Sequence, residues 1–171
     1  NGYFFMIKNF KKTNSGYTLL EIIFYTIFFA AISIAVINTM ITMTRAFKET
    51  TVQAELLQGG NIMERMSREI KQANNINLIT MNDLKLNTTD TEGANKIVEF
   101  SFSDPNIRLL ENDVFIGNLN TQNITVINLA FTQIDTAKGS AVKMLLTVKS
   151  NRDSQNRTES FYNTIVLRGN Y

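Results

Sequence analysis

The feature that most constrains this 171-residue chain is an uncharged, largely apolar run from Ile22 to Thr44. As a helix the run spans roughly 34 Å at about 1.5 Å per residue, which suffices to cross a hydrocarbon core about 30 Å thick. The sequence therefore predicts a transmembrane segment. Glu21 lies at its first end. Because an ionised side chain is costly in lipid, we expect this carboxylate to have a task.

The charges before the run predict its direction across the membrane. Three lysines and no acidic residue precede Gly16: Lys8, Lys11 and Lys12. By the positive-inside rule they keep the N-terminus in the cytoplasm, so the rest of the chain is expected outside it. If Met6 is the true start, the segment that flanks the apolar run begins at Met6, and we interpret residues 1–5 as upstream sequence. The alternative is a slightly longer native leader.

Composition excludes several kinds of chemistry. The chain has no Cys and no His, which excludes disulfides, thiolate metal sites and hydrolase triads that contain histidine. Of its 17 basic residues three are the leader lysines, so 14 remain against 15 acidic ones. This balance gives no global cationic bias and no clear signal for nucleic-acid binding. We expect a protein that is not an enzyme and has no cofactor and no metal.

Two simpler interpretations of the N-terminus are a secretory signal peptide and a plain signal anchor. A secretory signal peptide is shorter and ends at small residues. Ala30-Ala31 is a weak site of that kind, because cleavage there leaves an apolar N-terminus. A plain signal anchor explains the lysines and the apolar run, but it gives no reason for Gly16 or Glu21.

Beyond Thr44 the pattern becomes that of an amphipathic helix. Apolar residues recur at helical spacings: Val52, Leu56, Met63, Met66, Ile70 and Ala73. Charged and polar residues are expected on the other face: Glu49, Gln53, Arg65, Arg68, Glu69 and Lys71. We therefore expect one helix from about Thr18 to Asn74. Gly59-Gly60 predicts either a bend or close packing of the helix on a sheet.

Strands are expected in the second half of the chain. Residues 75–96 are interpreted as a long polar loop with a short strand at 77–80, in which a metal at Asp90 and Glu92 is improbable. The predicted strands are 97–102, 106–111, 114–116, 124–134, 141–149 and 161–168. Asn112-Asp113 and Lys138-Gly139-Ser140 are expected turns. The inward residues are expected to include Ile127, Leu129 and Phe131.

These elements predict an α+β fold. The last three strands form an antiparallel meander, because their connections are short. One face of the sheet needs cover, and the amphipathic half of the long helix supplies it.

The segment Gly16-Tyr17-Thr18-Leu19-Leu20-Glu21, with its lysine flank and apolar continuation, resembles the processing site of type IV pilins and pseudopilins. The resemblance implies a pilin-like fold with a long N-terminal helix, a transmembrane half plus an amphipathic half, packed on an antiparallel β-sheet. It also implies the domains 1–16 (leader), 17–44 (transmembrane and assembly helix) and 45–171 (extracytoplasmic domain).

By the same resemblance, a prepilin peptidase cuts between Gly16 and Tyr17 and N-methylates Tyr17. Glu21 corresponds to the family's assembly glutamate, which pairs with the N-terminal ammonium of a neighbouring subunit. The implied partners are other pilin or pseudopilin subunits, the prepilin peptidase, the inner-membrane assembly platform and membrane lipid. The implied location is the cytoplasmic membrane and then a periplasmic or surface filament.

Departures from the family's pattern favour a minor subunit. Asn38 lies where major pilins commonly have proline, and cysteines are absent. The ending Phe161 to Asn170 is similar to that of minor pilins and minor pseudopilins. The resemblance therefore implies a minor subunit of a type IV pilus-like filament. The alternatives are a minor pseudopilin of a type II secretion system and a membrane-anchored binding domain that does not polymerise.

Overall fold

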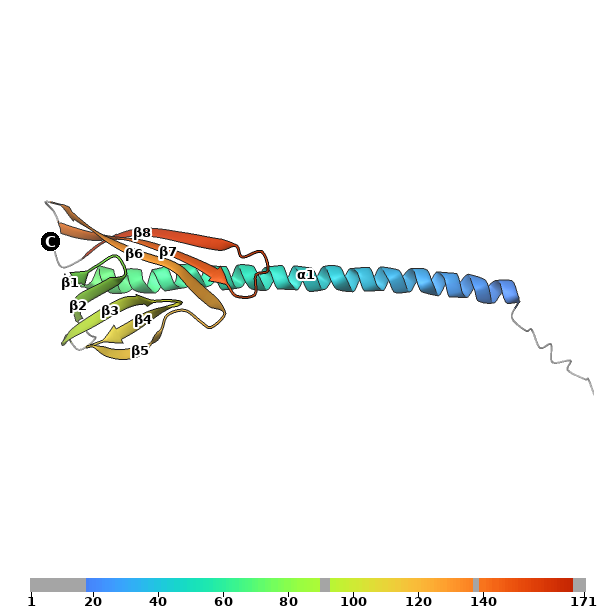
Figure 1. Ribbon diagram of the computed structural model, residues 1–171, viewed down its shortest axis with the longest axis horizontal. Coiled ribbons are helices and arrows are strands. Elements are labelled where there is room, and N and C mark those ends of the chain that lie inside the picture. Colours follow the sequence, from blue (N-terminus) through green and yellow to red (C-terminus); the bar gives the residue numbers. More distant parts are fainter. Residues whose placement is uncertain (1–17, 90–92, 137–138, 168–171) are drawn as a thin grey trace, which may run out of the picture. The chain divides into compact units, whose positions relative to one another are not determined.

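The computed structural model of the chain describes residues 18–89, 93–136 and 139–167 (Figure 1). They belong to two compact units, one up to Ala46 and the other from Phe47. A single helix, α1 (Leu19–Gln72, 54 residues), contributes to both units. The prediction of one long helix is therefore confirmed, and its end lies two residues before the predicted Asn74.

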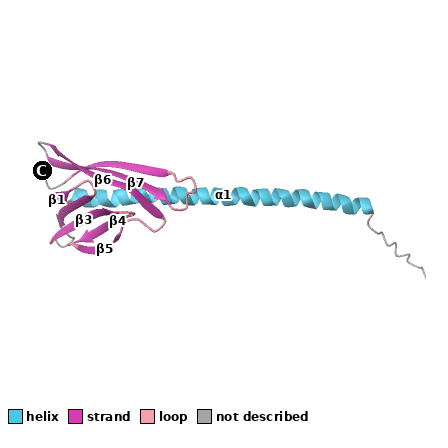
Figure 2. Ribbon diagram, viewed as in Figure 1, coloured by secondary structure: helices cyan, strands magenta, loops and turns pink. Residues whose placement is uncertain are grey.

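In the described part of the second unit, α1 is followed by eight strands, which Figure 2 shows in magenta. These are β1 (Asn75–Ile79), β2 (Asp83–Thr89), β3 (Asn95–Ser103), β4 (Asn106–Glu111), β5 (Val114–Asn118), β6 (Ile124–Thr136), β7 (Gly139–Ser150) and β8 (Thr158–Val166). They form a five-stranded sheet of order β1-β2-β3-β4-β5 and a three-stranded sheet of order β6-β7-β8. Every pairing is antiparallel. The α+β class and the terminal meander are confirmed.

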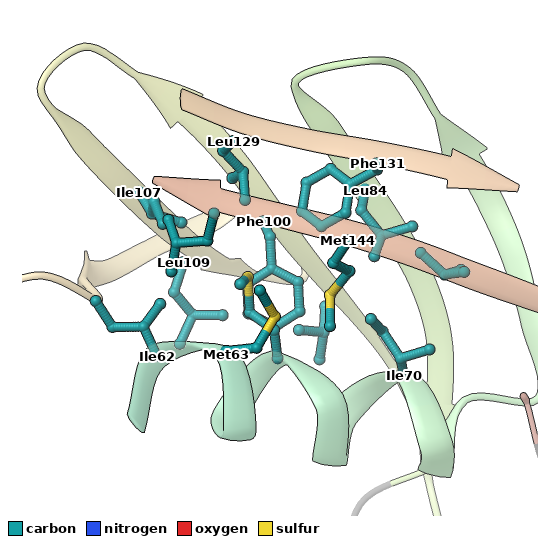
Figure 3. Packing of buried hydrophobic residues seen from close by; sticks show 14 of the residues in the cluster. Ile62, Met63, Ile70, Leu84, Phe100, Ile107, Leu109, Leu129, Phe131 and Met144 are labelled. Carbon is teal, nitrogen blue, oxygen red and sulfur yellow. The ribbon is translucent and has the colours of Figure 1, made fainter. Parts of the chain in front are cut away.

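One hydrophobic core joins α1 to both sheets. The helix contributes a stripe with the predicted spacing, which is buried at Val52, Ile62, Met63, Met66, Ile70 and, just after the helix, Ala73. Figure 3 shows Met63 below Phe100 of the first sheet, and Ile70 on the side of Met144 of the second. Burying a side chain of this size stabilises the fold by about 1.5–3 kcal/mol, so the stripe holds both sheets on the helix.

The turn at Asn112-Asp113 is confirmed. Both residues have positive φ, 50° and 64°, which is the backbone of a type I′ hairpin turn and is tolerated by Asn and Asp. The Asn112 side chain also accepts a hydrogen bond from the Ile97 N–H at 2.9 Å. The predicted β4–β5 hairpin is thus in place. Of the other predicted turn, Gly139 and Ser140 belong to β7, and Lys138 lies outside the described residues.

The prediction of a long loop over residues 75–96 is wrong, although the short strand expected at 77–80 overlaps β1. The segment contains β1 and β2, which pair with each other, and β2 also pairs with β3 over seven residues. Leu84, Leu86 and Thr88 alternate with more exposed residues in β2. Only two inward residues of β2 are large and apolar, so its sequence has a weak strand pattern. The strand is stabilised mainly by pairing with its neighbours.

The predicted inward position of Ile127 is also wrong. Ile127 is 48% exposed, whereas Val126 before it and Leu129 after it are buried. The register of β6 with β7 shifts between Val126 and Asn128. A β-bulge adds one residue and reverses which face the following residues occupy. Strict alternation along 124–134 cannot anticipate this change.

The single predicted sheet is in fact two. The break falls between β5 and β6, where the buried Asn120 side chain organises the connection. Asn120 accepts a hydrogen bond from the Ile107 N–H at 3.0 Å and donates to the Ile124 carbonyl at 2.9 Å. The sheets nevertheless meet at β6, where Phe131 N–H donates to the Met81 carbonyl at 3.0 Å.

Gly59 packs against Phe161 of β8. A Cβ at Gly59 would be 2.8 Å from Cδ2 of Phe161 and closer still to Cε2, whereas one at Gly60 would be 3.6 Å from Cε1. The helix is continuous through both glycines. Of the two interpretations of Gly59-Gly60, close packing is confirmed for Gly59.

This contact predicts opposite effects for two neighbouring substitutions. Gly59→Ala should destabilise the protein, because overpacking costs about 1–3 kcal/mol and exceeds the helix propensity gained, about 1 kcal/mol. Gly60→Ala, the matched control, should be neutral or stabilising. The measurement is urea unfolding of a fragment that starts at Arg45, since the whole core lies beyond that residue.

A second variant makes the test specific. Phe161→Leu in the Gly59→Ala background should remove most of the extra cost of Gly59→Ala, because the ring that meets the new methyl group is gone. Equal stability of Gly59→Ala and Gly60→Ala would show that the helix and β8 do not touch in this way.

Candidate functional site

The first part of α1 exposes a continuous apolar surface. Large side chains along it are more than two-fifths exposed, among them Leu19, Leu20, Ile22, Phe24, Phe28, Phe29, Ile34, Ile37 and Met40. No charged residue occurs from Ile22 to Thr44. By length and composition, α1 could span a membrane. A soluble protein does not leave so large an apolar surface in water, so this surface is expected to meet lipid or other helices.

The hydroxyl side chains of this apolar stretch are satisfied within the helix. Each of five hydroxyl groups donates to the carbonyl four residues earlier, at 2.8–2.9 Å: Thr26, Ser33, Thr39, Thr42 and Thr44. A hydroxyl with no partner costs several kcal/mol in hydrocarbon. These residues are therefore compatible with a bilayer despite their polarity.

The helix begins with a cap around Glu21. Thr18 precedes the helix, and its Oγ1 accepts a hydrogen bond from the Glu21 N–H at 3.3 Å. The Thr18 carbonyl accepts from the N–H groups of Glu21 at 3.0 Å and Ile22 at 3.2 Å. The sequence Thr-x-x-Glu is typical of a capping box, and an acidic residue in the first turn favours the helix dipole. Thr18 supplies its half of this box, and Glu21 contributes its N–H and its negative charge to the helix start. Sequence reasoning missed this local role, although the spacing shows it.

The carboxylate of Glu21 points along the helix rather than back to the cap. Its Oε1 accepts a hydrogen bond from the Tyr25 hydroxyl at 3.2 Å, one turn further on. Glu21 is half-buried, whereas its apolar neighbours Leu20 and Ile22 are exposed. The site on the described part of the helix thus consists of Thr18, Glu21 and Tyr25.

The other predicted site residues lie outside the described residues. This applies to the cleavage site Gly16 and Tyr17 and to the leader lysines Lys8, Lys11 and Lys12. It applies equally to Asp90 and Glu92. Within residues 18–89, 93–136 and 139–167, no group of three or more acidic side chains is arranged to hold a metal ion.

A second polar group, in the unit that starts at Phe47, holds the loop between β7 and β8 on the helix. We call Glu49, Asp153 and Arg157 the ion cluster. The Arg157 guanidinium donates to Oε2 of Glu49 at 2.9 Å through Nη2, and to Oδ2 of Asp153 at 2.9 Å through Nε. Two-pronged pairing of this kind fixes geometry as well as charge. Glu49 was expected on the solvent face but is half-buried by this contact.

Glu55 is a further carboxylate that sequence reasoning missed. It is 4% exposed on the helix stripe, where Ser150 Oγ donates to its Oε2 and Arg152 Nε lies 3.4 Å from its Oε1. Its spacing of three from Val52 places it on the apolar face, and that spacing is the signal available in the sequence. Both its partners are distant in sequence, so the pairing is not predictable from the chain.

The ion cluster changes how its carboxylates titrate. Hydrogen bonds from the Arg157 guanidinium, and then from the Gln155 N–H, hold the pKa of Asp153 far below its ordinary value. The hydrogen bond from Arg157 likewise lowers the pKa of Glu49. Because both pKa values are depressed by folding, their stabilising contribution is complete above the unfolded-state values, about 4, and is lost as the pH falls below them.

This linkage predicts a pH-dependent stability. The fragment that starts at Arg45 should lose stability to urea as the pH falls from about 5 to 2. Asp153→Asn should be less stable at pH 7 and should lose less over the same range, because one depressed carboxylate is gone. Asp135→Asn is the control, since hydrogen bonds from Gln133 and Ser140 also lower that pKa but without an ion pair to the helix. A pH profile of Asp153→Asn parallel to wild type would contradict the role of the cluster.

Comparison of the chain with protein-family models, curated proteins and solved structures finds no match. The indications of function are therefore the motif at the start of α1 and the geometry of the described residues.

Proposed function

We propose that this chain is a non-enzymatic minor subunit of a type IV pilus-like filament, assembled through its N-terminal helix after cleavage by a prepilin peptidase. The observation that carries the proposal is the division of α1. Its first part is uncharged and exposed from Ile22 to Thr44 with Glu21 at its start, and its second part is the central element of a folded unit. Such a helix can leave the bilayer and stack with others while the folded unit stays intact.

In this proposal Glu21 sets the register between subunits. Cleavage after Gly16 gives Tyr17 a free ammonium, and stacking brings the ammonium of one subunit to the Glu21 carboxylate of another. A charge buried without a partner costs about 3–5 kcal/mol. Only the axial position that pairs the two charges avoids this cost, so pairing selects one arrangement.

The same proposal gives the location and partners. The leader lysines keep the N-terminus in the cytoplasm, and the unit from Phe47 is extracytoplasmic. The subunit waits in the cytoplasmic membrane, where the peptidase and the assembly platform act on it, and then enters a periplasmic or surface filament.

The helix cap favours a second candidate function. Thr18 and Glu21 form part of a capping box, so Glu21 has a use in a helix that never assembles. The chain would then be a membrane-anchored binding domain in which Glu21 only starts the helix. The two functions differ in whether the charge of Glu21 matters, because Gln serves a capping box as well as Glu does.

Substitution of Glu21 tests the proposal. Incorporation into sheared filaments should fall by on the order of tenfold or more for Glu21→Val and Glu21→Gln, because the ammonium of the neighbour loses its counter-charge. Glu21→Asp should be intermediate, since it keeps the charge on a shorter arm. The measurement is co-purification of each variant with filaments at matched membrane levels.

The control is a substitution close to Glu21 that leaves its charge in place. Thr26→Val removes a hydroxyl that bonds only to its own helix and should incorporate like wild type. If Glu21→Gln also incorporates like wild type while Glu21→Val weakens the helix, the cap alone explains Glu21, and its role in register is wrong. Absence of the wild-type chain itself from sheared filaments would make the anchored binding domain the better assignment.

A further inference from the structure

The Glu21 carboxylate has two local donors within reach, and the structure selects one. A complete capping box would direct it back to the Thr18 N–H. The carboxylate instead accepts from the Tyr25 hydroxyl, at 3.2 Å. In the described part of the chain, Tyr25 is the only side chain found to donate to Glu21, and no hydrogen bond to Oε2 is found.

Tyr25 is suited to this contact by its position and its ring. It lies four residues after Glu21, and residues with this spacing are neighbours on a helix surface. The Phe24 ring meets the Tyr25 ring edge-on, with centroids 6.4 Å apart and planes at 69°. The hydroxyls of Thr26 and Ser33 are already bonded to helix carbonyls, so neither competes for the carboxylate.

The hydrogen bond between the Tyr25 hydroxyl and the Glu21 carboxylate is weak enough to be broken when a subunit docks. An O–H···O bond is commonly about 2.7–2.8 Å, and 3.2 Å is longer. A neutral hydroxyl is also a weaker partner for a carboxylate than an ammonium, because charge-assisted bonds are roughly twice as strong. Near the lipid, where water is scarce, even this weak donor reduces the cost of the carboxylate.

We propose that Tyr25 is a positioning residue for Glu21. Its hydroxyl holds Oε1 toward the apolar part of the helix, away from the cap, and leaves Oε2 open to the ammonium of an incoming subunit. This inference rests on the proposed function. Without the hydroxyl, the carboxylate turns back to the Thr18 N–H and closes the capping box, so docking first has to break that bond.

The test is a double-mutant cycle on the full chain in membranes. Tyr25→Phe removes only the hydroxyl and should lower incorporation into sheared filaments about three- to tenfold at matched membrane levels, as expected for one hydrogen bond. In a Glu21→Val background the same substitution should have no further effect, because there is no carboxylate to position. Thr26→Val, which removes a hydroxyl one residue away, should have no effect in either background.

The other possible results of this cycle contradict either the role of Tyr25 or the role of Glu21. If Glu21→Val is defective but Tyr25→Phe incorporates like wild type, the positioning role is wrong and the proposed function stands. If Tyr25→Phe lowers incorporation equally with and without Glu21, Tyr25 acts through packing, and the positioning role is again wrong. If Glu21→Val itself incorporates like wild type, the register role of Glu21 is wrong, and the role of Tyr25 fails with it. If the wild-type chain is absent from sheared filaments, the proposed function fails.

Discussion

Neither β-sheet of this protein can bury its apolar face without the second half of helix α1. Met63, Met66 and Ile70 are almost completely buried, and the core they form includes strands of both sheets. The ion cluster and Glu55 add polar contacts from the same helix to the loop after β7. Because one helix face supplies the shared core, any rearrangement of the helix between Phe47 and Gln72 would disturb both sheets.

In the proposed function, the first half of the helix has to meet a different requirement, because it lies in surroundings without water. Its hydroxyl groups bond to their own backbone, and Glu21 is held by Thr18 and Tyr25. In the proposed filament the apolar surface moves from lipid to the helices of neighbours, which are equally apolar. The transfer therefore changes little hydrophobic energy, and the pairing of a charge with a charge decides the position.

Much of the fold could be predicted from the sequence, because apolar residues recur at regular helical spacing in α1 and alternate regularly in β3 and β7. Val142, Met144, Leu146 and Val148 alternate as expected and are buried. The missed features depend on distant partners. β2 has few apolar residues and is stabilised by pairing on both sides, and the bulge at Ile127 depends on the register with β7. The Glu55–Ser150 contact joins residues 95 positions apart. The spacing of Glu21 identified a candidate site, but only the structure shows that Tyr25 belongs to it.

The proposed function depends on processing of the chain as a pilin, which the N-terminus of the mature protein tests most directly. The measurement is mass spectrometry of the N-terminal peptide, from protein extracted from the membranes of a host with an active prepilin peptidase. Processing as a pilin predicts a chain that begins at Tyr17 with one methyl group on its amino nitrogen. Peptides that still join Lys8–Gly16 to Tyr17 in such a host would contradict it, and the chain would then be a plain anchored protein.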